Sequence, residues 1–504
     1  MRLLVAGWKP ALRGQNTIIA AVLLAVGLAT GAGVAALAVT QNPATALIAA
    51  AAAAATIGAI ASIEVGILVI ILVACTDGLL KGISPGWHTQ LLKDYFLAIC
   101  LLRWGWLSVL GQRRESMRHR VVTAALVFAA WCVTEMFNVQ VRNQIMALAA
   151  LRSWLIWIPL FVLTHDYLHT RKQVERLTLF ILVLLIPIGV YAIVQYNVGY
   201  EHLYRLGPGF RHYARFGYMT KEYQSEMRPA STMVQPHNLA AGMSCAILLG
   251  AGAIGYFYRR RPHQLLTIVG IGIFTAAMLI TGGRTAVGGT AVGLLLLLLL
   301  TRGVRIAVVM AILFAVVGTQ ISGITQQRVI TRLATIVTER EYVRYRIFHH
   351  VQNALEFSQT HFLGAGLYTT TGAGRLIRQA GVAQRTVEDL PGVENDFARA
   401  MMELGVPGFL IYMWMLYAAG SGAFSAYRQL KDPRDRWLAI GLMSACLGVV
   451  TRLLTGPSLY TWPEGIFFWI FLGVALRLPQ IAAAEEEARL ASETAAGSDR
   501  SVAR

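Results

Sequence analysis

Three charged residues occupy positions that could support group transfer at a membrane surface. Arg228 opens the segment RPASTMVQPHNLAAG, Arg284 follows two glycines in ITGGRTAVGG, and Glu394 lies within PGVENDFARAMMELGVPG. A guanidinium group matches phosphate oxygens with paired hydrogen bonds, and a carboxylate can accept a proton from a hydroxyl. These residue types therefore suit the binding of a phosphate-bearing group by the arginines and a catalytic role for Glu394.

Each of these positions also has a structural interpretation. Arg228 could be an interfacial arginine whose charged end reaches water, and Arg284 could be an ordinary turn residue. Asn395 or Asp396 could cap the helix that begins there, because both side chains accept hydrogen bonds from a first helical turn. Glu394, the outermost of the three adjacent polar residues, would then remain available to a ligand.

Other polar residues near these positions are candidate substrate contacts. They are His237, Asn238, Asn395, Arg211, Arg215, Arg344 and Arg346. His237 and Asn238 begin the helix after Arg228 and could equally hydrogen-bond neighbouring helices. The four arginines lie in long loops, where a solvated or membrane-surface helix explains them equally well.

Membrane-spanning helices would have to position these residues. Of the 504 residues, 56% are apolar and 14% are charged, which is far fewer charges than in a soluble domain. The net charge of +18 does not indicate nucleic-acid binding, because the basic residues fall between apolar stretches. We expect an all-α polytopic membrane protein with about 14 transmembrane helices, or 12 to 14. The predicted spans are 17–39, 44–61, 63–75, 92–110, 120–137, 146–164, 176–198, 233–256, 264–281, 285–301, 304–320, 396–419, 437–455 and 464–478.

The distribution of basic residues predicts the orientation. With the N-terminus in the cytoplasm, every second short loop is basic if residues 44–75 cross an even number of times, as two spans or as a re-entrant hairpin. This places both termini in the cytoplasm and the three charged candidates on the outer face. The six predicted segments are 1–198 (helices), 199–232 (outer loop), 233–321 (helices), 322–394 (large outer loop with helices), 395–478 (helices) and 479–504 (disordered tail).

Motifs of nucleotide-driven, metal-dependent or serine chemistry are missing. The sequence has no GxSxG, no Walker-type glycine loop, no HExxH and no DxD pair, and its five cysteines lack metal-ligand spacing. We therefore expect a transfer that needs no metal and no cofactor.

Four segments in this order resemble the O-antigen ligase and O-antigen polymerase family. They are RPASTMVQPHNLAAG, LITGGRTAVGG, RYRIFHHVQNALEFSQTHFLGAGLYT and VENDFARAMMELGVPGFLIYMW, and together they cover about residues 228–414. The resemblance implies a GT-C-like glycosyltransferase of the bacterial inner membrane with a periplasmic active site. It implies that Arg228 and Arg284 hold the diphosphate of an undecaprenyl diphosphate-linked glycan, the donor. Membrane lipids would be the other partners.

One departure from the family bears on the reaction. Glu394 stands where the ligases have the histidine of their His-Asn motif, and Asn395 follows it. The difference favours an inverting polymerase that joins glycan repeat units, with a ligase that attaches glycan to lipid A core as the alternative. A polysaccharide or lipid transporter is the alternative of another class, although the sequence shows no internal repeats or paired broken helices. Sugar identity, linkage and oligomeric state leave no recognisable pattern.

Overall fold

The structure is a computed structural model that describes residues 43–84, 87–110, 115–141, 143–199, 201–205, 207, 209–210, 228–301, 348–370, 393, 395–456 and 458–502. These residues form helices and no strands, and eight of their helical segments are long and apolar enough to cross a membrane. The eight are Ile63–Ile83, Gln144–Tyr167, Arg171–Val198, Pro236–Tyr256, Arg261–Ile280, Arg284–Thr301, Asp396–Gln429 and Glu464–Thr494. The prediction of a helical, multi-pass membrane protein is confirmed at this level.

The chain divides into two compact units. Unit 1 comprises Met1–Arg113, Val198–Met227 and Thr232–Gln235. Its described helices are α3 (Pro43–Ala61), α4 (Ile63–Ile83), α5 (Trp87–Val109) and η2 (Glu201–Arg205). The alanine-rich run therefore forms two helices, separated at Ser62, which has an extended backbone.

Unit 1 contains a buried cluster of charged residues on α4 and α5. Asp77 lies 2.6 Å from Lys81, one helical turn away, and 2.5 Å from Lys93 of α5. Charges at membrane depth are costly unless they are paired. The cluster thus joins α4 to α5 by buried ionic contacts.

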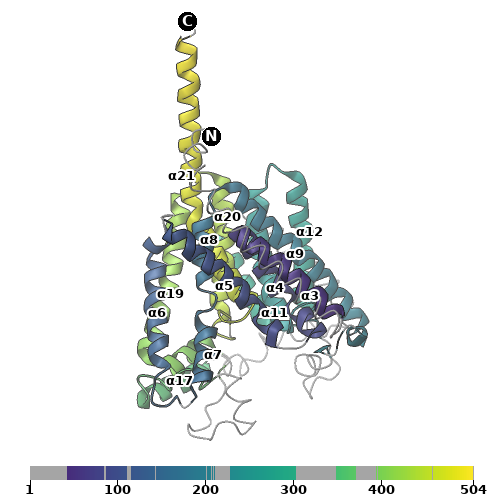
Figure 1. Cartoon of the computed structure of the whole chain (residues 1–504), viewed down its shortest axis with the longest axis vertical. Helices are drawn as coiled ribbons and strands as arrows, with labels where there is room; N and C mark the ends of the chain where they lie inside the picture. Colours follow the sequence, from purple (N-terminus) through teal and green to yellow (C-terminus); the bar gives the residue numbers. More distant parts are fainter. Residues whose placement is uncertain are drawn as a thin grey trace. The chain divides into compact units, whose positions relative to one another are not determined.

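Unit 2 comprises Arg114–Asn197, Arg228–Ser231 and Pro236–Arg504. Its described helices are η1 (Ser116–Arg118), α6 (Arg120–Glu135), α7 (Gln144–Leu155), α8 (Pro159–Tyr167), α9 (Arg171–Val198), α11 (Pro236–Tyr256), α12 (Arg261–Ile280), α13 (Arg284–Thr301), α17 (His350–Thr360), α19 (Asp396–Gln429), α20 (Pro433–Arg452) and α21 (Glu464–Val502). Helix α6 runs beside α19, and α17 packs against α19 (Figure 1).

Small residues allow α20 to pack closely against α11 and α13. A Cβ atom on Gly252 of α11 would lie 2.6 Å from the Cα of Gly441 in α20. A Cβ atom on Gly289 of α13 would lie 2.7 Å from the carbonyl oxygen of Gly448. Close approach of backbones is how helices associate inside a membrane, where lipid is as apolar as the side chains. These contacts make α11, α13 and α20 the core of unit 2.

Helix α19 is broken within its apolar sequence. Gly405 has φ 70° and ψ −177°, and a Cβ atom there would lie 2.3 Å from the backbone carbon of Leu363. Only glycine suits this backbone conformation and this close approach. Groups from two other segments bond to the backbone at the break: Val406 N donates to Phe362 O, in the loop after α17 (His350–Thr360), at 2.9 Å, and Trp131 Nε1 of α6 donates to Leu404 O at 2.9 Å. Residues 396–404 therefore form a separate half-helix.

Helix α21 continues to Val502, where the composition of 479–504 predicts a disordered tail. Arg489 lies 2.7 Å from Glu486 and 3.9 Å from Glu493, at the spacings that stabilise exposed helices. Alanine and glutamate also have high helix propensity. Figure 1 shows the yellow end of α21 extending past the other helices of unit 2.

Candidate functional site

Several helix ends of unit 2 meet around a group of polar residues. Asn238 at the start of α11 donates to the carbonyl oxygen of Trp462, just before α21. Asp396 N at the start of α19 donates to Leu453 O, at the end of α20, at 3.0 Å. A Cβ atom on Gly283, before α13, would lie 2.8 Å from the Cβ of Ala240 in α11. The starts of α11, α13, α19 and α21 thus share one end of the unit with the end of α20.

Arg228 lies in a segment that α9 holds in place. Gln195 of α9 is 1% exposed, and its Oε1 accepts hydrogen bonds from Ala230 N at 3.1 Å and Ser231 N at 2.7 Å. Ser231 Oγ also donates to Ile188 O at 2.6 Å. The segment is therefore anchored to α9 on the side next to Arg228.

The structure brings Arg228 to the turn from which Arg284 begins. Arg228 Nε donates to Thr281 O at 2.7 Å, and Arg284 begins α13 three residues after Thr281. Gly282 has φ 61°, so the glycine pair makes the sharp turn that the sequence predicts. Two arginines separated by 56 positions in the sequence therefore lie at one turn, and both are partly buried.

His237 and Arg452 lie close to this pair of arginines. Arg228 and Arg452 both interact electrostatically with His237, whose side chain is exposed at the start of α11. Asn238, the next residue, is buried and bonds to the backbone before α21. His237 is thus the more accessible of these two predicted residues, and Asn238 holds helix ends together.

Arg452 is balanced by a carboxylate. Its Nη1 lies 2.8 Å from Glu464 Oε1, and the side chains are 5% and 1% exposed. Within the described part of the chain Arg452 Nε and Nη1 have no hydrogen-bond partner, whereas the carboxylate of Glu464 also interacts with Ser458 and Thr461. The guanidinium group of this buried ion pair therefore has unused donors close to His237.

Asn395 caps the helix that carries the predicted motif. Its Oδ1 accepts from Phe397 N at 2.9 Å and Ala398 N at 3.2 Å, and its Nδ2 donates to Leu454 O at 2.7 Å. Asp396 Oδ2 accepts from Ser458 N at 3.0 Å. The side chain of Asn395 is thus used to hold α19 against the end of α20, which is a positioning role.

A second buried ion pair lies one turn further along α19. Arg399 Nε lies 3.2 Å from Glu403 Oε2, which also accepts a hydrogen bond from Trp154 Nε1 at 3.0 Å. The guanidinium carbon lies 4.3 Å from the ring centre of Trp154 and 4.2 Å from that of Tyr460. Burial raises the pKa of Tyr460, so its phenol keeps its proton. Arg399 is thus enclosed between two aromatic rings and a carboxylate.

Five of the predicted residues lie outside the part of the chain that the structure describes. They are Glu394, Arg211, Arg215, Arg344 and Arg346. The neighbours of Glu394 are described, and Val393 packs with Ala398 and Met402 between α17 and the first half of α19. Glu394 is therefore adjacent in sequence to a fixed helix start.

The sequence prediction missed Arg399, Glu403, Arg452 and Glu464. All four are buried in unit 2. Their signal was present, because each lies within or next to an apolar stretch and an ionisable residue at membrane depth is a functional candidate. The i, i+4 spacing of Arg399 and Glu403 also indicates a pair on one helical face.

The arrangement can hold an anion. Within the described residues no group of three or more His, Cys, Asp and Glu side chains could hold a metal. The starts of four helices carry positive partial charge, and Arg228 and Arg284 add full charges near them. Such a concentration of donors suits phosphate oxygens.

Comparisons with known proteins do not place this chain in a family: no family model and no curated protein matches it.

Proposed function

We propose that the protein is a metal-independent, inverting glycosyltransferase that takes a glycan from an undecaprenyl diphosphate carrier at the periplasmic face of a bacterial inner membrane. The observation that carries this proposal is the contact of Arg228 with the turn just before Arg284. In the complete fold we expect 12 to 14 spans, a GT-C-like arrangement and both termini in the cytoplasm. A polymerase that joins glycan repeat units is favoured over a ligase.

The leaving group accounts for the arginines. As the bond between the anomeric carbon and the diphosphate oxygen breaks, negative charge grows on the diphosphate. Arg228 and Arg284 would stabilise that charge more strongly in the transition state than in the ground state. The hydrogen bond from Arg228 Nε to Thr281 O fixes the plane of one guanidinium group. Because this guanidinium group is already in position, little free energy is spent on reorienting it during the reaction.

The acceptor hydroxyl attacks from the opposite side. Its oxygen forms the new bond to the anomeric carbon, its proton passes to the carboxylate of Glu394, and undecaprenyl diphosphate leaves. Attack opposite to the leaving group inverts the anomeric carbon. A positioned general base contributes about 10² to 10⁴-fold to such a step. Capping by Asn395 supports this role because it fixes the helix start next to Glu394.

The test is a reaction of the purified full chain in detergent with a defined undecaprenyl diphosphate-linked oligosaccharide. A ladder of products identifies a polymerase, and one discrete conjugate with added lipid A core identifies a ligase. No glycan transfer to either acceptor would overturn the proposal. A detergent solution holds no gradient, so transport cannot imitate the result.

Two variants test the assigned roles in that reaction. Glu394→Gln should keep donor binding and lose product, because the amide preserves shape but cannot accept the proton. Arg284→Gln should slow transfer by about 10²-fold. Arg259→Gln is the matched control, since Arg259 is exposed in the loop between α11 and α12, at their other ends. Full activity of Glu394→Gln would exclude its role as base.

The break in α19 favours a transporter as the second candidate. Interrupted helices at membrane depth often line transport sites, and Gly405 interrupts α19 beside the Arg399–Glu403 pair. Uptake of a lipid-linked glycan by proteoliposomes, without formation of any new glycosidic bond, would select this function.

A further inference from the structure

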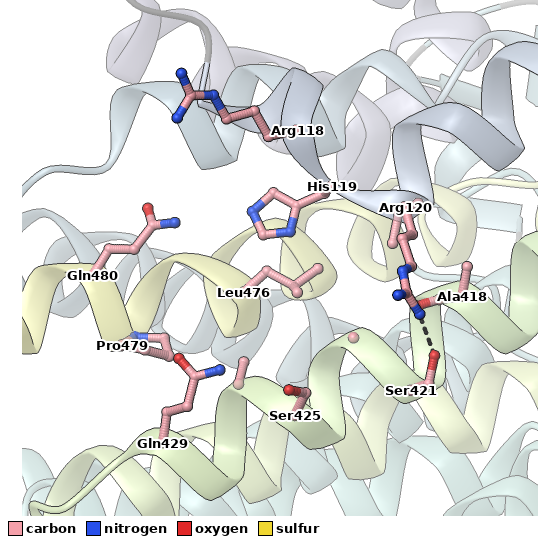
Figure 2. A pocket seen from close by; sticks show the side chains of 13 residues that line it. Arg118, His119, Arg120, Ala418, Ser421, Ser425, Gln429, Leu476, Pro479 and Gln480 are labelled. Carbon is pink, nitrogen blue, oxygen red and sulfur yellow. Dashed lines mark hydrogen bonds between the residues drawn. The ribbon is translucent and has the colours of Figure 1, made fainter.

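A second polar site lies at the other end of unit 2, away from the residues of the proposed transfer reaction. A cavity of about 460 Å³ lies between the start of α6, the last third of α19 and the middle of α21. Figure 2 shows side chains of these three elements and of η1 around it. This volume is within the range of about 300 to 1,000 Å³ that small-molecule sites occupy.

One side of the cavity is basic. Arg118, His119 and Arg120 line it, and both arginines are exposed. Neither arginine forms an ion pair with another described residue, and none of the described residues around the cavity is acidic. Arg477 on α21 differs from them, because it pairs with Glu115 and bonds to Leu168 O at 2.9 Å. The charge of Arg118 and Arg120 is thus not neutralised within the described part of the chain.

The opposite side provides neutral hydrogen-bonding groups and an apolar wall. Ser421, Ser425 and Gln429 follow one another at intervals of four residues along α19 and line the cavity with Gln480 of α21. Leu476 and nearby small apolar residues complete the wall. Hydroxyl and amide groups donate to phosphate oxygens, and the apolar wall suits the carbon chain of an amphiphile.

The basic side is held rigidly. Arg118 ends η1, whose first residue, Ser116, bonds to Asp166 through its N at 2.9 Å and its Oγ at 2.8 Å. His119 Nε2 lies 3.0 Å from His165 Nε2. These contacts attach the short segment before α6 to α8. A site whose charged groups are already in position loses little conformational entropy on binding.

We propose that this cavity binds a phosphate-bearing anion, with Arg118 and Arg120 contacting the phosphate and the serines and glutamines of α19 and α21 contacting its polar substituents. An acidic phospholipid headgroup and a soluble phosphate ester share this chemistry. The inference does not depend on the glycosyltransferase proposal, since the two sites use different residues.

Calorimetric titration of the full chain in detergent tests the site. The probes are a short-chain phosphatidylglycerol, a short-chain phosphatidylcholine, glycerol 1-phosphate and inorganic phosphate. We expect saturable binding of phosphatidylglycerol that is tighter than that of phosphatidylcholine. Displacement by glycerol 1-phosphate or phosphate would identify a soluble ligand, whereas failure to displace would identify a lipid. Both results support a phosphate site.

Two kinds of variant locate the binding. Arg118→Gln with Arg120→Gln should weaken it about tenfold, because two charge-assisted contacts are lost near the surface. The matched control, Arg259→Gln with Arg261→Gln, removes two exposed arginines that do not line the cavity. Ser425→Trp should block the cavity, whereas Tyr417→Trp changes an exposed position of α19 outside it. Absence of saturable binding, or binding that neither cavity variant weakens, would overturn the proposal.

Discussion

At the end of unit 2 where α19 and α21 begin, Arg399 and Arg452 are buried against carboxylates, whereas at the end where α6 begins Arg118 and Arg120 are exposed around a cavity. Arg399 and Arg452 each have a glutamate within about 3 Å. Arg118 and Arg120 have no such partner among the described residues. A buried charge must be compensated inside the protein, while an exposed one can exchange water for a ligand. The first group should therefore control stability, and the second should control binding.

The largest effect should come from breaking a buried pair. Glu403→Ala leaves the Arg399 guanidinium without its carboxylate and removes the acceptor of Trp154 and Thr370. We expect a loss of about 4 kcal/mol in the free energy of unfolding. Equilibrium unfolding of the purified protein in detergent measures it.

An exposed pair provides the control for that variant. Glu493→Ala removes a partner of Arg489 on the tail of α21, where both side chains are 62% exposed. Exposed pairs contribute about 0.5 kcal/mol or less. Equal losses in Glu403→Ala and Glu493→Ala would contradict the view that burial makes the ion pairs at this end important for stability.

A smaller effect should come from the anchor of Arg228. Gln195→Ala removes the acceptor for Ala230 N and Ser231 N, both buried, and should cost about 2 kcal/mol of unfolding free energy. It should also lower donor affinity, since Arg228 loses its fixed segment. Gln173→Ala is the control on the same helix, because Gln173 accepts from exposed backbone groups. Identical donor affinity in wild type and Gln195→Ala would count against the positioning role.

The smallest effect concerns pH at the opposite end. Burial, together with the charge of His165, lowers the pKa of His119 to about 4. Its ordinary pKa is about 6.5, so the unfolded chain binds a proton there before the folded protein does, and stability falls as pH drops from about 6.5 toward 4. Because the ring is partly exposed, we expect a loss of about 1 kcal/mol between pH 7 and pH 5.

The variant His119→Asn should reduce that dependence. Asp166, Glu115 and Arg477 also act on His119 and remain in place in the variant, so any slope that they contribute persists. The measurement is unfolding in detergent at several pH values for both proteins. An unchanged slope would contradict this assignment, because it would show that His119 binds protons equally in the folded and unfolded states.

Local sequence signals predicted much of the fold. The glycine pair before Arg284 predicted a sharp turn, and Gly282 makes it with a positive φ. The run of residues 44–75 forms two helices with a break at Ser62. The break at Gly405 was not predicted, because it depends on the distant loop that contains Leu363. Hydropathy averages over a window and cannot register a single residue whose conformation is set by a tertiary contact.

The candidate site also contains residues that the sequence predicted and residues that it did not. The contact of Arg228 with the turn before Arg284 followed from the predicted order of spans, which placed both at one membrane face. The prediction missed the four buried charged residues Arg399, Glu403, Arg452 and Glu464. The pairing of Arg452 in α20 with Glu464 in α21 depends on how these helices pack. The enclosure of Arg399 by the rings of Trp154 and Tyr460 depends on helix packing in the same way. A charged residue in an apolar stretch can be identified from the sequence as a functional candidate. Its partner can be identified only from the packing of the helices.

Because of the break at Gly405, the two halves of α19 can move separately. Its first half packs against α17 through Ala398 and Met402, and its second half packs against α6, where Tyr412 meets Phe128. No continuous ladder of backbone hydrogen bonds joins the halves, so a tilt of the first need not travel into the second. A ligand pulling on the first half would therefore displace α17 with it, and α6 would follow only through the hydrogen bond from Trp131 to Leu404 O.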